Sequence, residues 1–126
     1  MSERSIITSE VLDMWWKIRE YFGLSKSIPL RIHWTPVYTV RSATGSAITP
    51  DYIKRSKRDT SPYVNITIPD SLKWFDSHKE NVRKILTHEA LHFRIPKHTP
   101  ETRKYGYSHN IEKDTYTEEF MRKIQF

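Results

Sequence analysis

The chain has 126 residues, which is enough for one domain, spanning residues 1–126, with a single core of modest size. It has no cysteine, which excludes disulfides, cysteine-based zinc ribbons, iron–sulfur clusters and a cysteine nucleophile. The net charge of +6 favours acidic partners such as DNA, although a solvated basic surface explains the same charge.

The start of the chain has no apolar run of the signal-peptide type, because Glu3, Arg4, Glu10 and Asp13 interrupt it. No stretch approaches the roughly 20 apolar residues of a membrane span. We therefore expect a soluble, cytoplasmic protein without a membrane partner.

Helical spacing of apolar residues predicts a first helix that begins after Thr8 or Ser9 and ends at Gly23. Residues 1–8 are expected to be frayed. The predicted buried face consists of Val11, Trp15, Ile18 and Phe22.

Alternating apolar and polar residues predict strands at 29–35 and 63–68, the second with Val64, Ile66 and Ile68 on one face. A further strand is expected at 37–41. Residues 44–46 are predicted to form a turn, from which a short strand begins at 47–48.

Residues 50–62 are predicted to form a loop that carries the densest basic cluster. Such a cluster is either solvated or in contact with nucleic-acid phosphates. The candidate nucleic-acid-binding residues are Lys54, Arg55, Lys57 and Arg58.

Helices are expected in the second half of the chain. Asp70 or Ser71 can cap a short turn through residues 72–75, and a helix from about His78 to Phe93 precedes Pro96. Residues 99–110 look irregular. A last helix begins near residue 111 and is expected to bury Tyr116, Phe120 and Ile124.

An H-E-x-x-H motif lies on the helix predicted at 78–93. Residues four apart on a helix lie one above the other, so His88 and His92 can reach one zinc ion. Glu89 points about 100° around the axis, where it can act as the general base on a zinc-bound water. The alternative is a pair of surface histidines on an ordinary helix.

A catalytic zinc usually has three protein ligands and an open position. His98 is the favoured third ligand, because Pro96 ends the helix and lets the chain turn back towards the metal. Glu112, near the start of the last helix, is the alternative. Each of them can instead be an exposed side chain.

The stretch from His88 to Glu101 resembles zincin metallopeptidases, and within them the SprT/WLM group, which has a later histidine beside a Pro-Glu pair. Thr102 departs from the aromatic residue often found there, and the zinc ribbon of some members is absent. Ile95 replaces the glycine of metzincins. A minimal gluzincin, with Glu112 as ligand, is similar in size and is the rival family.

The resemblance implies an α+β zincin-like fold. In it, a small, twisted, mostly antiparallel sheet packs on a backing helix and the H-E-x-x-H helix, and a C-terminal helix follows. It also implies that strand 63–68 binds extended peptide by strand addition. A donor for the reaction's oxyanion is needed as well, with Tyr105, Tyr107 and His109 as candidates.

The sequence thus predicts a zinc-dependent metallopeptidase, a hydrolase and endopeptidase that acts on protein or peptide and is SprT-like and potentially DNA-associated. The alternative is a non-enzymatic basic module that binds nucleic acid. Folding of residues 124–126 back into the cleft is a further open question.

Overall fold

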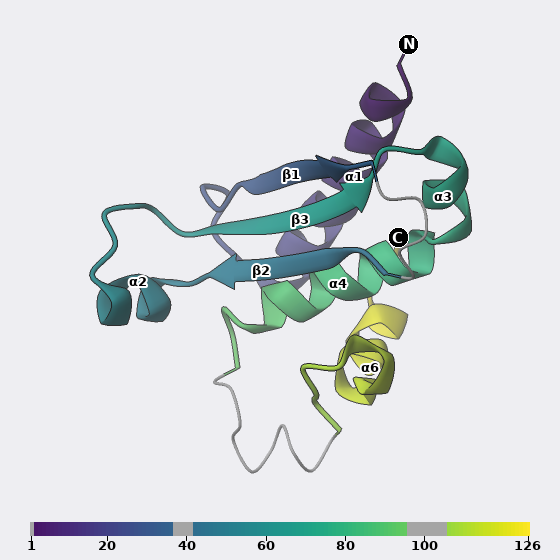
Figure 1. The fold of residues 1–126 in the computed structure, drawn as a ribbon. Helices are drawn as coiled ribbons and strands as arrows, with labels where there is room; N and C mark the ends of the chain where they lie inside the picture. Colours follow the sequence, from purple (N-terminus) through teal and green to yellow (C-terminus); the bar gives the residue numbers. More distant parts are fainter. Residues whose placement is uncertain (1, 37–41, 96–105) are drawn as a thin grey trace.

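The computed structural model describes residues 2–36, 42–95 and 106–126 (Figure 1). Within these ranges the chain is an α+β protein with five α-helices and a three-stranded sheet, which confirms the α+β class that was expected. The elements are α1 (Glu3–Phe22), β1 (Leu30–Thr35), β2 (Thr44–Ile48), α2 (Pro50–Ser56), β3 (Tyr63–Pro69), α3 (Leu72–Ser77), α4 (Lys79–Leu91), the 3-10 helix η1 (Ile111–Lys113) and α6 (Thr115–Lys123). Across these residues, no helix combines the length and the apolar character that crossing a membrane would require.

Helix α1 begins earlier than predicted. The side chain of Ser2 accepts a hydrogen bond from the backbone N–H of Ser5 and so caps the helix, and the expected frayed start is wrong. Ile7, in that segment, is fully buried. The predicted end at Gly23 is confirmed, because Gly23 adopts the left-handed conformation with φ 62°.

The sheet is mixed, with the order β1-β3-β2. Strand β3 pairs in parallel with β1 and antiparallel with β2, so the expectation of a mostly antiparallel sheet is wrong. The chain passes through β2 and α2 before it inserts β3 between the two earlier strands (Figure 1). The alternation of apolar and polar residues in a strand does not specify which other strands pair with it.

The turn predicted at 44–46 is wrong, because these residues open β2 and pair with β3. The loop predicted at 50–62 is partly wrong as well. Helix α2 forms there because Thr49 Oγ1 accepts from the N–H of Tyr52, and Pro50 occupies the first helical position. The strand predicted at 37–41 lies outside the described residues.

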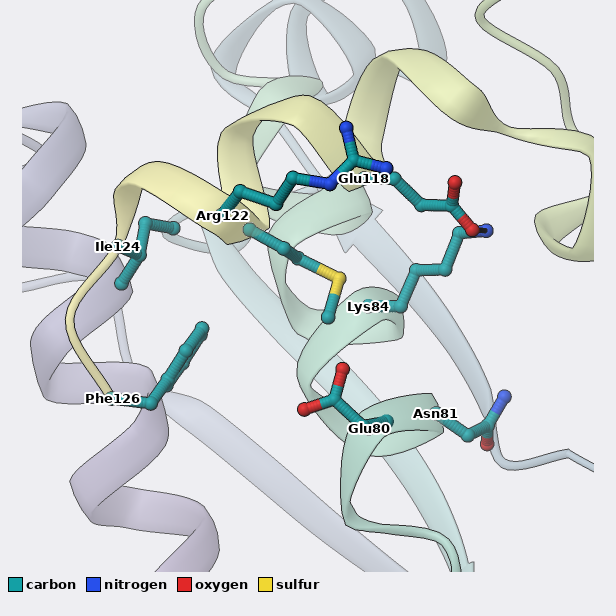
Figure 2. A pocket seen from close by; sticks show the side chains of 8 residues that line it. Glu80, Asn81, Lys84, Glu118, Arg122, Ile124 and Phe126 are labelled. Atoms are coloured by element: carbon teal, nitrogen blue, oxygen red, sulfur yellow. Dashed lines mark hydrogen bonds and ion pairs between the residues drawn. The ribbon is translucent and has the colours of Figure 1, made fainter.

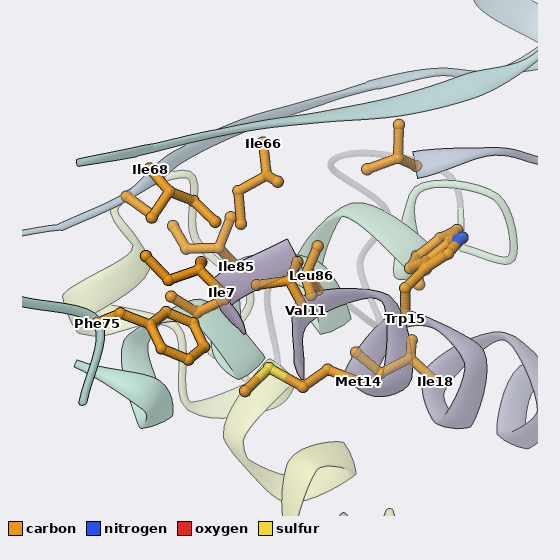
Figure 3. Close-up of a cluster of buried hydrophobic side chains, with 14 of the residues drawn as sticks. Ile7, Val11, Met14, Trp15, Ile18, Ile66, Ile68, Phe75, Ile85 and Leu86 are labelled. Carbon is orange, nitrogen blue, oxygen red and sulfur yellow. The ribbon is translucent and has the colours of Figure 1, made fainter. Parts of the chain in front are cut away.

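The core lies between the sheet and a layer formed by α1 and α4 (Figure 3). Strand β3 contributes the predicted side chains Val64, Ile66 and Ile68, all with no exposed surface. Helix α4 contributes Val82 and Leu86, which are equally buried. The opposite face of the sheet carries mainly polar side chains, such as His33, Asn65 and Thr67. Helices α1 and α4 therefore cover one face of the sheet.

Helix α6 packs against α4 and against the end of α1 (Figure 1). Lys84 of α4 forms an ion pair of 2.9 Å with Glu118 of α6 at one edge of a hollow of about 560 Å³ (Figure 2). The C-terminal Phe126 lines the same hollow, and its carbonyl oxygen accepts from Lys17 Nζ at 2.9 Å. The chain end therefore packs near α1 and does not fold back into the cleft at the H-E-x-x-H helix.

Candidate metal centre

The H-E-x-x-H residues lie at the end of α4 and face a cavity of about 530 Å³. His88 and Glu89 are only 5% and 7% exposed, and His92 is partly buried. Ile85 and the residues of β2 line the same cavity. The two histidines are therefore not exposed side chains of an ordinary helix, because they form part of the wall of a cavity that is partly open to solvent.

His109 joins these two histidines. One ring nitrogen from each of His88, His92 and His109 lies within 4.8 Å of the others, so the three side chains can hold a metal ion. The rings of His92 and His109 are nearly parallel, with centroids 5.7 Å apart. Among the described residues, these three histidines form a group that could hold a metal ion, and two of them belong to the H-E-x-x-H motif.

From the sequence, His109 was expected only as a candidate donor to an oxyanion, and its place among the potential metal ligands was not predicted. His98, the favoured third ligand, lies outside the described residues and stays a prediction. Glu112, the alternative, is exposed in η1 and is not a member of the histidine group. No spacing rule links His109, which lies 17 residues after His92, to the motif.

Asp114 fixes the orientation of His88. Nδ1 of His88 lies 2.6 Å from Oδ2 of Asp114, and the carboxylate is fully buried. An Nδ1–H that donates to this carboxylate leaves Nε2 free to bind a metal, which is the usual arrangement of a metal-binding histidine. The sequence analysis did not identify Asp114, although its position before Thr115 is typical of a helix cap.

Asp114 also caps α6. Its Oδ1 accepts from the backbone N–H of Thr117 at 3.0 Å, and the Thr117 hydroxyl donates to Oδ2. Burial alone would raise the pKa of Asp114, but the hydrogen bonds from His88 and Thr117 outweigh it and hold the pKa below its ordinary value. The carboxylate is therefore ionised, as the partner of a metal-binding histidine should be.

Tyr107 closes one side of the histidine group. Its hydroxyl oxygen lies 3.5 Å from Nε2 of His88 and 3.3 Å from Nε2 of His92, and its ring stacks on that of His88. Burial, followed by the negative charges of Asp114 and Glu89, raises the pKa of the Tyr107 phenol well above its usual range. Without a metal, the phenol is therefore neutral and hydrogen-bonds to the imidazoles. Tyr105 lies outside the described residues.

Strand β2 forms the opposite wall of the cavity. Gly45 permits its close approach to α4, because a Cβ atom there would lie 2.8 Å from Cγ2 of Ile85 and 3.1 Å from Cγ of Glu89. Strand β2 is an edge strand in the described part of the sheet, whereas β3 is paired on both sides. The expectation that strand 63–68 binds peptide by strand addition is therefore wrong, since its backbone groups are already used.

Among the predicted nucleic-acid-binding residues, Lys54 and Arg55 lie on α2, Lys57 is its C-cap and Arg58 follows, and all four are exposed. Arg55 pairs with Asp51 at 2.9 Å, and the guanidinium of Arg58 lies over the ring of Tyr52. Tyr52 also lines the cavity at the histidine group. The basic cluster thus adjoins the cavity, and its binding to nucleic acid stays a prediction.

The residues present fit a metal ion. Three imidazoles converge, one of them is oriented by a buried carboxylate, and nitrogen ligands of this kind suit zinc. Ligands of a tetrahedral zinc, with bonds of about 2.0–2.1 Å, lie about 3.3–3.4 Å apart. The wider nitrogen separations, of up to 4.8 Å, imply a small inward movement on binding.

No protein-family model matches the chain, and no curated protein or solved structure is significantly similar to it. The motif and the side chains around it are therefore the observations that bear on function.

Proposed function

We propose that this protein is a zinc-dependent metallopeptidase. The observation that carries the proposal is the convergence of three histidines and a buried glutamate on one cavity beside an edge strand. A purely structural zinc site would have no use for a carboxylate held beside its ligands in a cavity that substrate can enter.

His88, His92 and His109 would hold the metal, and Asp114 would keep His88 in the tautomer that binds through Nε2. When bound, zinc supplies a Lewis acid that polarises a peptide carbonyl and lowers the pKa of water. Ligation by His109 would differ from the SprT-like pattern, in which His98 is the ligand, and from the gluzincin pattern, in which Glu112 is.

Glu89 would serve as the general base and then as the general acid. Its carboxylate lines the cavity, and Oε2 lies 4.0 Å from Nε2 of His92, so it borders the position of the metal. It would accept a proton from the attacking water as the new C–O bond forms, and return it to the amine nitrogen as the C–N bond breaks. The walls formed by Ile85 and β2 restrict access of bulk water to this carboxylate.

Strand β2 supplies a means of holding an extended peptide. Its five residues pair with β3 along one edge, and the opposite edge has no partner strand within the described ranges. Backbone pairing with that edge would orient a peptide along the cavity with little dependence on its sequence. We therefore propose unstructured protein or peptide as the substrate.

DNA association belongs to the same proposal as a second property. The exposed cations of α2 adjoin the cavity through Tyr52, so a bound nucleic acid would bring protein substrates close to the catalytic residues. In the alternative function, a basic module without catalysis, α2 would bind nucleic acid in the same way, and Glu89 would have no role.

The replacement Glu89→Gln tests the proposal. It keeps the size of the side chain but removes the base, so hydrolysis of an unstructured protein should fall by about 10²–10⁴-fold. Zinc content, measured on dialysed protein, should remain at the wild-type level because Glu89 is not one of the proposed ligands. Glu119→Gln is the matched control, because Glu119 is exposed on α6.

Equal hydrolysis by Glu89→Gln and the wild type would remove Glu89 from catalysis and favour the binding module. Absence of zinc from the wild type after loading would refute the metal centre itself. Loss of zinc from the Gln variant alone would make Glu89 a ligand.

A further inference from the structure

Tyr107 lies in the site, but the proposed function assigns it no role. The proposed peptidase needs three ligands and one open position on the metal. The hydroxyl of Tyr107 lies beside two of the three histidines that would hold the metal.

The distances support a shared metal. Ligand atoms of one tetrahedral ion are separated by about 3.3–3.4 Å. The hydroxyl oxygen of Tyr107 lies 3.5 Å from Nε2 of His88, and 3.3 Å and 3.1 Å from Nε2 and Nδ1 of His92, so its distances to these nitrogens are similar to those between two ligands of one tetrahedral ion.

The orientation of the His88 ring also supports a shared metal. Its Nδ1 is occupied by Asp114, so its Nε2 is directed to the side on which the Tyr107 hydroxyl lies. Once a metal takes the imidazole lone pairs, the phenol oxygen can no longer be hydrogen-bonded to them. Its own lone pair then faces the ion.

The backbone holds Tyr107 in this place. Gly106 has φ 78°, and a Cβ atom there would lie 2.2 Å from the Thr115 hydroxyl, so the chain is pressed against the first residue of α6. The Tyr107 ring also meets Tyr116 edge-on, with centroids 6.0 Å apart. The side chain is therefore anchored from the C-terminal helix and does not reach the histidines from a free loop.

We propose that Tyr107 is a fourth protein ligand, which binds the same metal as the three histidines through its hydroxyl oxygen and closes the site in the resting protein. The inference rests on the metal centre of the proposed function. It follows that a peptide carbonyl must displace Tyr107 before it can be hydrolysed, so Tyr107 regulates access to the metal.

Copper(II) serves as a probe, because a phenolate bound to this ion gives a visible charge-transfer band that imidazole ligands do not give. The wild-type protein, loaded with one equivalent of Cu²⁺, should show this band. The Tyr107→Phe variant should bind the same amount of copper and lose the band. Tyr116→Phe is the matched control, because it removes the neighbouring buried hydroxyl and should keep the band.

A second measurement uses azide, which needs an open position on the metal. Azide should bind more tightly to copper-loaded Tyr107→Phe than to the wild type, while the Tyr116→Phe control should behave as the wild type. Copper uptake without a charge-transfer band in the wild type, or a band that survives in Tyr107→Phe, would overturn the inference and leave the metallopeptidase intact. Failure of the wild type to take up zinc or copper would instead refute the proposed function.

Discussion

The Nδ1 atom of His88 lies 2.6 Å from Oδ2 of Asp114, and this buried carboxylate also caps helix α6. One side chain therefore joins the candidate metal centre to the C-terminal helix. The pair connects positions 26 residues apart. Changes at Asp114 should consequently affect two properties that can be measured separately.

Asp114→Asn should weaken metal binding more than it weakens the fold. Asparagine is as good a helix cap as aspartate, but it is a poorer acceptor for the His88 ring and has no charge. We expect metal affinity to fall by about 10–100-fold. The metal-free protein should lose less unfolding free energy than in Asp114→Ala, because the cap is kept and only the charge of the carboxylate is removed. Asp114→Ala should lose the cap as well, at a further cost of about 0.5–2 kcal/mol. Equal metal affinity in Asp114→Asn and the wild type would contradict the orienting role.

Acid should destabilise the metal-free protein partly through Asp114. The folded protein holds the pKa of this carboxyl below its ordinary value of 3.8, so its ionised form contributes stability that is complete above that value. The contribution is lost as the pH falls from 3.8 through the lowered pKa of the folded state. Urea unfolding at a series of pH values should therefore show a shallower acid dependence in Asp114→Asn. Parallel curves for the two proteins would show that the carboxylate has no such role.

Gly45→Ala should destabilise the protein, although replacing glycine in a strand usually has the opposite effect. The added Cβ would meet Ile85 and Glu89 at 2.8 and 3.1 Å and push β2 away from α4. We expect a loss of about 1–3 kcal/mol in denaturant unfolding. Thr44→Ala, at an exposed position of the same strand, is the control. A more stable Gly45→Ala protein would show that β2 can move away freely.

The identity of the third ligand can be decided by comparing three single changes. His109→Ala should reduce zinc affinity strongly, because its ring nitrogen belongs to the histidine group. Glu112→Ala should leave affinity unchanged, since Glu112 is exposed and is not in that group. His98→Ala tests the prediction from sequence, and loss of zinc from this variant alone would restore the SprT-like ligand pattern.

DNA binding should depend steeply on salt if α2 contacts phosphates. Lys54→Ala and Lys57→Ala should each weaken binding uniformly across sequences and reduce the salt slope by about 1. Arg122→Ala, on the exposed side of α6, is the control for general charge. Absence of binding at low salt would remove DNA association from the proposed function.

Local patterns in the sequence predicted local structure well. The alternation in β1 and β3, the left-handed end of α1 at Gly23 and the helical spacing of the H-E-x-x-H residues all depend on near neighbours in the chain. The sequence also indicated that Ser71 could cap α3, and its hydroxyl accepts from the backbone N–H of Trp74.

The errors arose where distant residues decide the structure. The 44–46 segment was predicted to turn because of Gly45, but that glycine serves a close approach to α4, 40 or more residues later. His109 and Asp114 reach the site through packing of α6 on α4, and no periodicity reveals such a contact. The central place of β3 is likewise a matter of topology, which strand patterns do not encode.

The way α6 is fastened to α4 has a consequence for the amount of this protein in a cell. Helix α6 and its N-cap are joined to α4 through the Lys84–Glu118 and His88–Asp114 pairs, and the proposed metal would add a bond between α4 and His109, which precedes α6 in the chain. A metal that binds only the folded chain stabilises it by about 2.7 kcal/mol at a free concentration 100 times its dissociation constant. Scarcity of the metal would then leave the folded chain less stable and more accessible to cellular proteases, so the metal supply would influence the abundance of the protein.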